Sequence, residues 1–233
     1  MPFRFLPLAT GLLPIIAIHA SLLLAIVAGA IAPCIPYLDG CASISATGRY
    51  EPAVFLFKPA MTVEAVLMVC YWISNAIWLR ALSRVTGQHA GPSTALMSIL
   101  GVVSALALIV YVTFLGTQTP IYEFMRKFGI YFYFLFSVIA QIMLAGKVLG
   151  LSKQLELVSV ATISRMQLWL AAMPLALGAL NLALKSTLDD ADSAENMIEW
   201  ASALLMHVYY VLTYFSWRDT AFGFNWTVEL RRG

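Results

Sequence analysis

The sequence predicts an all-α, polytopic membrane protein with six transmembrane helices and with both termini in the cytoplasm. The chain is 61% hydrophobic and only 11% charged, whereas about 25% charged residues are usual in soluble domains. Its apolar residues gather in six long runs, each close to the roughly 20 residues that cross the hydrocarbon core as a helix. Because lipid offers the backbone no hydrogen-bond partner, such runs must be helical.

The six predicted helices form a single transmembrane domain over residues 1–233. They cover residues 8–32, 53–79, 93–115, 127–149, 160–184 and 197–217. The first run is longer than the apolar part of a signal peptide, so we interpret it as a retained helix. His207 interrupts the last run, but Trp200 and Trp217 lie near its two ends, where aromatic residues mark the membrane surfaces.

The segments between the runs account for the boundaries of the other helices. Residues 80–92 contain two glycines and a proline, which separate the second run from the third. The polar segment TQTPIYEFMRK separates the third run from the fourth, and residues 150–159 separate the fourth from the fifth. Four acidic residues precede the sixth run: Asp189, Asp190, Asp192 and Glu195. We interpret them as a solvated start of that helix, in preference to a cation site.

The distribution of Lys and Arg predicts the orientation. With the N-terminus in the cytoplasm, nine of the 14 basic residues lie on the inner side. The outer five are Arg49, Lys58, Arg126, Lys127 and Lys185. The positive-inside rule therefore favours cytoplasmic termini. We expect the protein to reside in the plasma or inner membrane if it is bacterial, and in an endomembrane if it is eukaryotic. The sequence contains no basic cluster that would bind nucleic acid.

The segment between the first two runs is the one polar, motif-like stretch on the outer side. Its sequence, from Ile35 to Lys58, is IPYLDGCASISATGRYEPAVFLFK. Asp39, Ser45, Arg49 and Glu51 provide donors and acceptors beside the membrane surface. An arginine at this place can hold a lipid phosphate with two hydrogen bonds. The alternative is an ion pair of Arg49 with Glu51 or Asp39 that orders the loop.

Three cysteines are present. Cys34 and Cys41 flank the head of the outer loop, on the side where disulfides persist. Loop geometry decides whether they are bridged, so the sequence leaves both states open. Cys70 falls inside the second run, where we expect a small core residue. No CxxC, His/Cys cluster or HExxH pattern occurs, so we expect no metal and no cofactor.

Ionisable residues within the runs are costly in lipid and are therefore functional candidates. Lys58 lies at the outer end of the second run, where a long side chain reaches the membrane surface. Glu64 lies about two turns deeper, on a helical face that should point into the bundle. That face continues with Met68, Tyr71, Asn75 and Trp78.

The sixth run has a similar face, with Glu199 near its outer end and His207 near its middle. Contact between His207 and Glu64 would form a proton-transfer unit. Without that contact, His207 is a hydrogen-bonded packing residue.

Two patches carry a family resemblance. After the first run, IPYLD at residues 35–39 and SATGRYEP at 45–52 are similar to the two halves of a segment of the type PYISD-TG-x-PPE. Glu199–Trp200 and the stretch YYVLTYFSWRD are similar to an EW pair and the aromatic run that follows it. The chain resembles the DRAM/Frag/Sfk family of six-helix membrane proteins, related to the factor that remodels the lipid of GPI anchors. This chain departs by an added GCASIS and by EP in place of PPE.

The resemblance implies lipid remodelling, phospholipid organisation or autophagy regulation. We therefore expect an integral membrane protein that binds lipid headgroups at its outer face, with membrane lipids as partners. The candidate residues are Asp39, Ser45, Arg49, Glu51, Lys58, Glu64, Glu199 and His207. One alternative is a non-enzymatic scaffold or regulator of other membrane proteins, and another is a small proton-coupled transporter. The sequence contains no recognisable catalytic motif, so it leaves open whether the protein is an enzyme.

Overall fold

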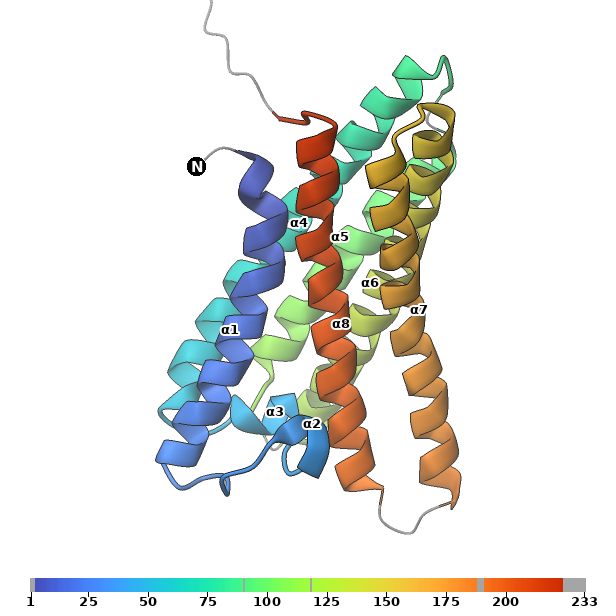
Figure 1. The fold of residues 1–233 in the computed structure, drawn as a ribbon. Coiled ribbons are helices and arrows are strands. Elements are labelled where there is room, and N and C mark those ends of the chain that lie inside the picture. The colour runs from blue at the N-terminus through green and yellow to red at the C-terminus, as the bar shows by residue number, and fades with distance from the viewer. Residues whose placement is uncertain (1–2, 90, 118, 188–190, 224–233) are drawn as a thin grey trace, which may run out of the picture.

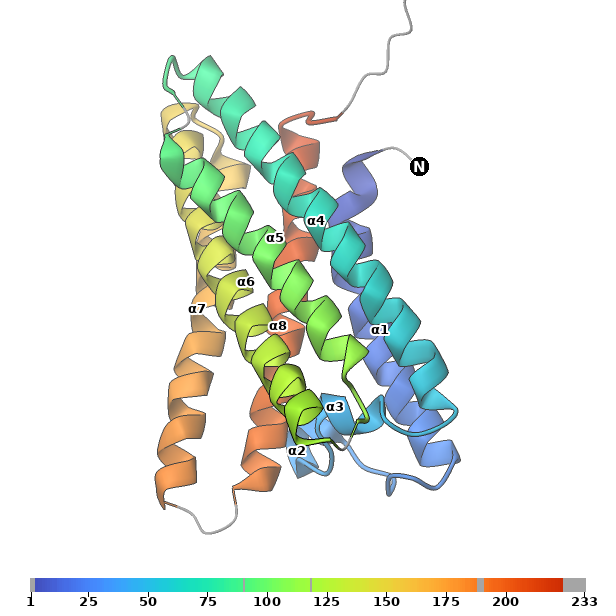
Figure 2. The same ribbon diagram turned by 180° about the vertical axis from the view of Figure 1, so that it is seen from behind.

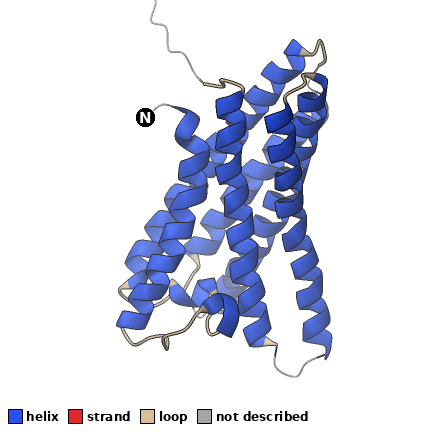
Figure 3. Ribbon diagram, viewed as in Figure 1, coloured by secondary structure: helices blue, strands red, loops and turns tan. Residues whose placement is uncertain are grey.

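Six long helices run the length of the molecule, and two short helices lie across one of its ends (Figure 1). The computed structural model describes residues 3–89, 91–117, 119–187 and 191–223. The long helices are α1 (Leu6–Val27), α4 (Ala53–Val85), α5 (Pro92–Thr113), α6 (Pro120–Gln154), α7 (Val158–Thr187) and α8 (Asp192–Asp219). The short ones are α2 (Pro36–Asp39) and α3 (Ile44–Thr47), and a 3-10 turn, η1 (Phe3–Phe5), precedes α1. Over these ranges the chain forms helices and loops and no strand (Figure 3).

Each long helix packs against its neighbours in the sequence, and α8 closes the ring by packing against α1 (Figure 1 and Figure 2). The start of α1 and the end of α8 therefore lie at the same end of the bundle. We call the opposite end, which carries α2 and α3, the loop end. The chain is an all-α, polytopic membrane protein, as the composition predicts.

Among the described residues, five helices are long and apolar enough to cross a membrane: Phe3–Val27, Ala53–Val85, Pro92–Thr113, Pro120–Gln154 and Val158–Thr187. The long helix that does not meet this criterion is α8. With 28 residues it is long enough, so its composition makes the difference.

Polar side chains and backbone carbonyls of α8 bond to neighbouring helices. The hydroxyl groups of Thr213 and Tyr71 in α4 are 2.8 Å apart. The side-chain amide of Gln141 in α6 donates to the Met206 carbonyl at 3.0 Å. A helix covered by protein in this way can cross a membrane without being apolar.

Five predicted boundaries differ from the structure by five or more residues. The second helix ends at Val85, the fourth ends at Gln154 and the sixth begins at Asp192. The first helix ends at Val27 and not at Ala32, because Gly29 adopts a left-handed conformation with φ +73°. The fourth begins at Pro120 and not at Lys127. Proline suits the first turn of a helix, where its missing N–H costs no hydrogen bond.

The predicted polar and aromatic face of α4 points into the bundle. None of its five residues, from Glu64 to Trp78, is more than 2% exposed. The expectation for Cys70 is wrong, because this residue is exposed. It shares an exposed stripe with Val66, Ile73 and Ile77 at three- and four-residue spacing, on the surface of the helix that faces away from the bundle.

Candidate functional site

The loop between α1 and α4 is held against the first turns of α8. Gly40 has a left-handed φ of +58°, and a Cβ atom there would overlap the backbone carbonyl of Ser193. The side-chain amide of Asn196 donates to the Gly40 carbonyl at 2.8 Å. The indole N–H of Trp200 donates to the Ala42 carbonyl at 2.8 Å. These α8 residues are spaced by three and four positions, so one face of the helix positions the loop.

The same loop is also tied to itself and to α1. A disulfide joins Cys34 to Cys41. The Tyr37 hydroxyl lies 2.9 Å from the His19 Nε2 atom of α1, and the Tyr37 ring packs edge-on against Trp200 at 5.5 Å. Burial raises the pKa of the Tyr37 phenol, so it stays neutral at physiological pH. The loop is thereby anchored on both sides.

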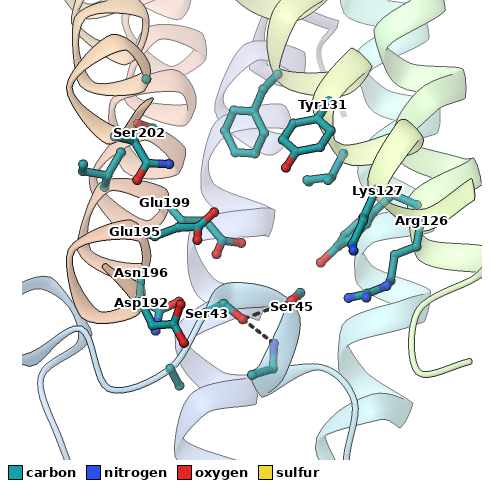
Figure 4. A pocket seen from close by; sticks show the side chains of 18 of the residues that line it. Ser43, Ser45, Arg126, Lys127, Tyr131, Asp192, Glu195, Asn196, Glu199 and Ser202 are labelled. Atoms are coloured by element: carbon teal, nitrogen blue, oxygen red, sulfur yellow. Dashed lines mark hydrogen bonds between the residues drawn. The ribbon is translucent and has the colours of Figure 1, made fainter. Parts of the chain in front are cut away.

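Between this loop and helices α6, α7 and α8 lies a cavity of about 850 Å³ (Figure 4). Figure 4 shows Lys127, Arg126 and Tyr131 of α6 on one side of the cavity. The opposite side is α8, which presents Asp192, Glu195, Asn196, Glu199 and Ser202. The loop adds Ser43, Ser45 and Arg49. A basic wall and an acidic wall therefore face each other.

Away from the loop end the lining becomes apolar. Phe134, Leu135 and Val138 of α6 line this part, together with Leu175 of α7. Val138 lies eleven residues beyond Lys127, which is about 16 Å along the helix at about 1.5 Å per residue. The cavity is thus charged at the loop end and apolar toward the middle of the bundle. Its volume falls within the usual range for small-molecule sites.

Several charged residues of the lining are already paired on their own side. Lys127 lies 2.9 Å from Glu123, and Glu195 lies 2.7 Å from Lys185 of α7. The Arg49 guanidinium donates to the Ser45 hydroxyl at 2.9 Å.

The Glu199 carboxylate faces the backbone N–H groups of Ile44 and Ser45. In the described ranges no ion pair involves Arg49 or Glu199. One cation and one anion of the lining thus have no ionic partner there.

Three polar groups of the lining also have no hydrogen-bond partner in the described part of the chain. They are the Tyr111 hydroxyl, the Arg126 Nε and the side-chain oxygen of Asn181. Tyr111 is only 3% exposed. Buried polar groups are nearly always paired in folded proteins, so these three are available to a polar ligand or to water.

The predicted site residues divide into two groups. Ser45, Arg49 and Glu199 line the cavity, whereas Asp39, Glu51 and Lys58 do not. One Asp39 carboxylate oxygen accepts from the backbone N–H of Ile35 at 2.7 Å. Glu51 is exposed, and Lys58 is half-buried on α4. The alternative of a loop-ordering ion pair of Arg49 with Glu51 or Asp39 is wrong, because no ion pair in the described residues involves Arg49, whose side chain bonds to Ser45.

Glu64 and His207 lie apart from this cavity and do not bond to each other. Both are buried, at 0% and 4% exposure. The His207 ring nitrogens lie 2.6 Å from the Ala203 carbonyl and 3.3 Å from the Tyr133 hydroxyl. Neither carboxyl oxygen of Glu64 has a hydrogen-bond partner within the described ranges. The proton-transfer unit on which the transporter hypothesis depends is therefore not formed.

Sequence reasoning did not assign the α6 wall or the start of α8 to the site. The signal for the α6 wall was the adjacent pair Arg126–Lys127, on the side predicted to carry few basic residues. The sequence predicts a solvated helix start for the acidic segment, whereas Asp192 and Glu195 line the cavity. Asp189 and Asp190 lie outside the described residues.

The fold and the cavity define a multi-pass integral membrane protein with a partly charged pocket at one end of its helix bundle. The family model described as the Frag1/DRAM/Sfk1/Cwh43P N-terminal domain matches residues 2–220. The chain therefore belongs to this family, as the two sequence patches indicate. No curated protein and no solved structure matches the chain.

Proposed function

We propose that this protein binds the headgroup of a membrane lipid in the loop-end cavity and acts in lipid organisation or remodelling. The observation that carries the proposal is the division of the cavity lining. Charged side chains surround its loop end, and mainly apolar side chains of α6 and α7 line the part nearer the middle of the bundle. A lipid has the same division between headgroup and acyl chain.

The groups at the loop end suit a phosphate. Arg49 has no ion pair in the described residues. Arg126 Nη2 lies 3.7 Å from Glu123, but the Arg126 Nε has no hydrogen-bond partner there. A guanidinium matches the geometry of a phosphate and can donate two parallel hydrogen bonds to it. The donors that a phosphate requires are therefore present and available.

The apolar part of the lining suits an acyl chain. Leu135 of α6 and Leu175 of α7 both line the cavity, and each is 45% exposed. Beyond Pro174, α7 packs loosely, with Leu180 49% and Leu182 73% exposed. Apolar surface is thus accessible beside the charged pocket, where an acyl chain would lie.

The test measures the lipids that copurify with the full-length protein in mild detergent, by mass spectrometry. We expect Arg49→Ala combined with Arg126→Ala to lower the amount of bound phospholipid by at least tenfold, because the loss of even one charge-assisted hydrogen bond of roughly 1.5–3 kcal/mol corresponds to about tenfold or more. Lys58→Ala is the matched control, since it removes a basic residue outside the cavity. It should leave the bound lipid unchanged.

Thermal unfolding of each purified variant shows that it is folded before lipids are compared. If the folded double variant retains as much phospholipid as the wild type and Lys58→Ala, the proposal is wrong.

A further inference from the structure

We infer that the headgroup held in this cavity is zwitterionic, with a phosphate and a primary amine, as in phosphoethanolamine. The inference rests on the proposed function and specifies the class of lipid. Its basis is the separation of opposite charges onto two facing walls (Figure 4).

Among the described residues, the charges of the lining are balanced in number. Three of them are cationic: Arg49, Arg126 and Lys127. Three are anionic: Asp192, Glu195 and Glu199. A headgroup with charge of only one sign would be repelled by one of the two walls. A headgroup with both charges, separated by a short linker, meets the opposite charge on each side.

The phosphate belongs at the basic wall. Arginine and lysine side chains only donate hydrogen bonds, so they cannot pair with an ammonium group. The Tyr111 hydroxyl lines the same cavity, is 3% exposed and has no partner in the described part of the chain. It supplies a further buried donor for a phosphate oxygen.

The amine belongs at the acidic wall, with Glu199 as its main contact. Glu195 is already paired with Lys185 at 2.7 Å, whereas Glu199 has no ionic partner among the described residues. An ammonium group has three N–H donors for carboxylate oxygens.

A quaternary amine has no such donors and is usually held by aromatic rings. The α8 residues labelled in Figure 4 present carboxylate, amide and hydroxyl groups and no aromatic ring. A primary amine therefore fits this wall better than choline does.

The experiment compares lipids that differ only in the headgroup. Purified full-length protein is titrated with phosphatidylethanolamine, N-acetyl-phosphatidylethanolamine, phosphatidylcholine and phosphatidylglycerol, and bound lipid is counted by native mass spectrometry. We expect phosphatidylethanolamine to bind about tenfold more tightly than the other three, because only it offers ammonium hydrogen bonds to a carboxylate. Water-soluble phosphoethanolamine should compete weakly, because it lacks acyl chains.

Glu199→Gln tests the amine contact directly. Glutamine keeps the size of the side chain and an oxygen that can accept from Ile44 and Ser45, but it has no charge. We expect this variant to bind all four lipids with similar affinity. Glu51→Gln is the matched control, because Glu51 is exposed and outside the cavity. It should keep the wild-type preference.

The outcomes separate this inference from the proposed function. Equal binding of all four lipids by the wild type, or a preference for phosphatidylglycerol, overturns the inference and leaves lipid binding intact. Equal binding of phosphatidylcholine and phosphatidylethanolamine overturns the conclusion that the amine is primary. A preference for phosphatidylethanolamine that persists in Glu199→Gln overturns the role of Glu199. If soluble phosphoethanolamine displaces the lipid with an affinity similar to that of the lipid itself, the ligand is not a lipid headgroup. Binding of no lipid overturns both proposals. The wild-type series decides the headgroup even if Glu199→Gln does not fold.

Discussion

Glu64 shows how a single residue can be costly to the fold and still lie outside the pocket. It is completely buried in α4, and its carboxyl oxygens have no hydrogen-bond partner in the described ranges. Insertion of a charged side chain at the centre of a membrane costs about 2.5–3.5 kcal/mol. The hydroxyl groups of Tyr133 and Tyr210 lie within electrostatic range. These hydroxyl groups make the surroundings of Glu64 polar, but among the described residues no ion pair compensates a charge there.

A substitution at this position measures that cost. Glu64→Gln keeps the volume and removes the ionisable group, so we expect the thermal unfolding temperature in detergent to be equal to or above that of the wild type. Glu64→Ala should destabilise the protein by about 2 kcal/mol or more, because it opens a cavity in a packed interior. Thermal unfolding followed by circular dichroism distinguishes the two.

A Glu64→Gln protein that unfolds several degrees below the wild type would contradict this account. It would show that the carboxylate itself is stabilised, by an ion or by a proton donor. The transporter hypothesis would then regain support.

At the scale of elements, the packing of the α2–α3 loop on α8 creates the pocket. Gly40, Asn196 and Trp200 make the contacts that hold the loop on the helix. The loop in turn places Ser45 and Arg49 at the cavity. A weaker loop–helix contact should therefore affect both loop order and ligand binding.

Trp200→Phe tests this coupling. It removes the 2.8 Å hydrogen bond to the Ala42 carbonyl and leaves that buried acceptor unpaired, at a cost of about 1–3 kcal/mol. We expect faster amide hydrogen exchange over residues 36–47 and less copurified lipid than in the wild type. Trp169→Phe is the control, because Trp169 is 74% exposed on α7 and should show neither effect. Unchanged exchange in Trp200→Phe would show that the disulfide and Tyr37 alone order the loop.

For the whole molecule, the ring of six helices places the start of α1 and the end of α8 at one end. Helix packing does not define which side of the membrane this end faces. The orientation rests on the excess of Lys and Arg predicted for the cytoplasmic side. A cytoplasmic position for the termini would place the cavity on the opposite side of the membrane.

Cysteine labelling measures this orientation. In a Cys70→Ser background, Ser186→Cys at the loop end should react with a membrane-impermeant maleimide added to intact cells. If the protein resides in an endomembrane, sealed cytoplasm-out vesicles should show the reverse accessibility. Lys153→Cys at the other end should react from the cytoplasmic side. Both positions are exposed. The opposite pattern in either setting would reverse the predicted topology and place the cavity at the cytoplasmic surface.

Much of the fold could be predicted because it depends on local patterns. Apolar runs predict where helices lie, and the three- and four-residue spacing from Glu64 to Trp78 indicates which face is buried. The helix boundary at Val27 was harder to predict from the sequence, since small apolar residues continue past the glycine that ends the helix. The exposure of Cys70 follows from its place on the opposite face, a feature that composition alone does not reveal.

The site depended on contacts that no local pattern contains. Arg49, Arg126 and Glu199 come from segments far apart in the sequence, and they line one cavity only because α6, α8 and the loop pack together. For the same reason, the sequence suggested Glu51 as an ion-pair partner of Arg49, whereas the fold provides Ser45.

The sequence by itself determined the membrane class, the helices, their buried faces and the family, because hydropathy and periodicity are properties of each segment. Only the tertiary structure decided which charges face each other across the cavity. Electrostatic and hydrogen-bond interactions act over a few ångströms, and helix packing alone brings distant residues within that range.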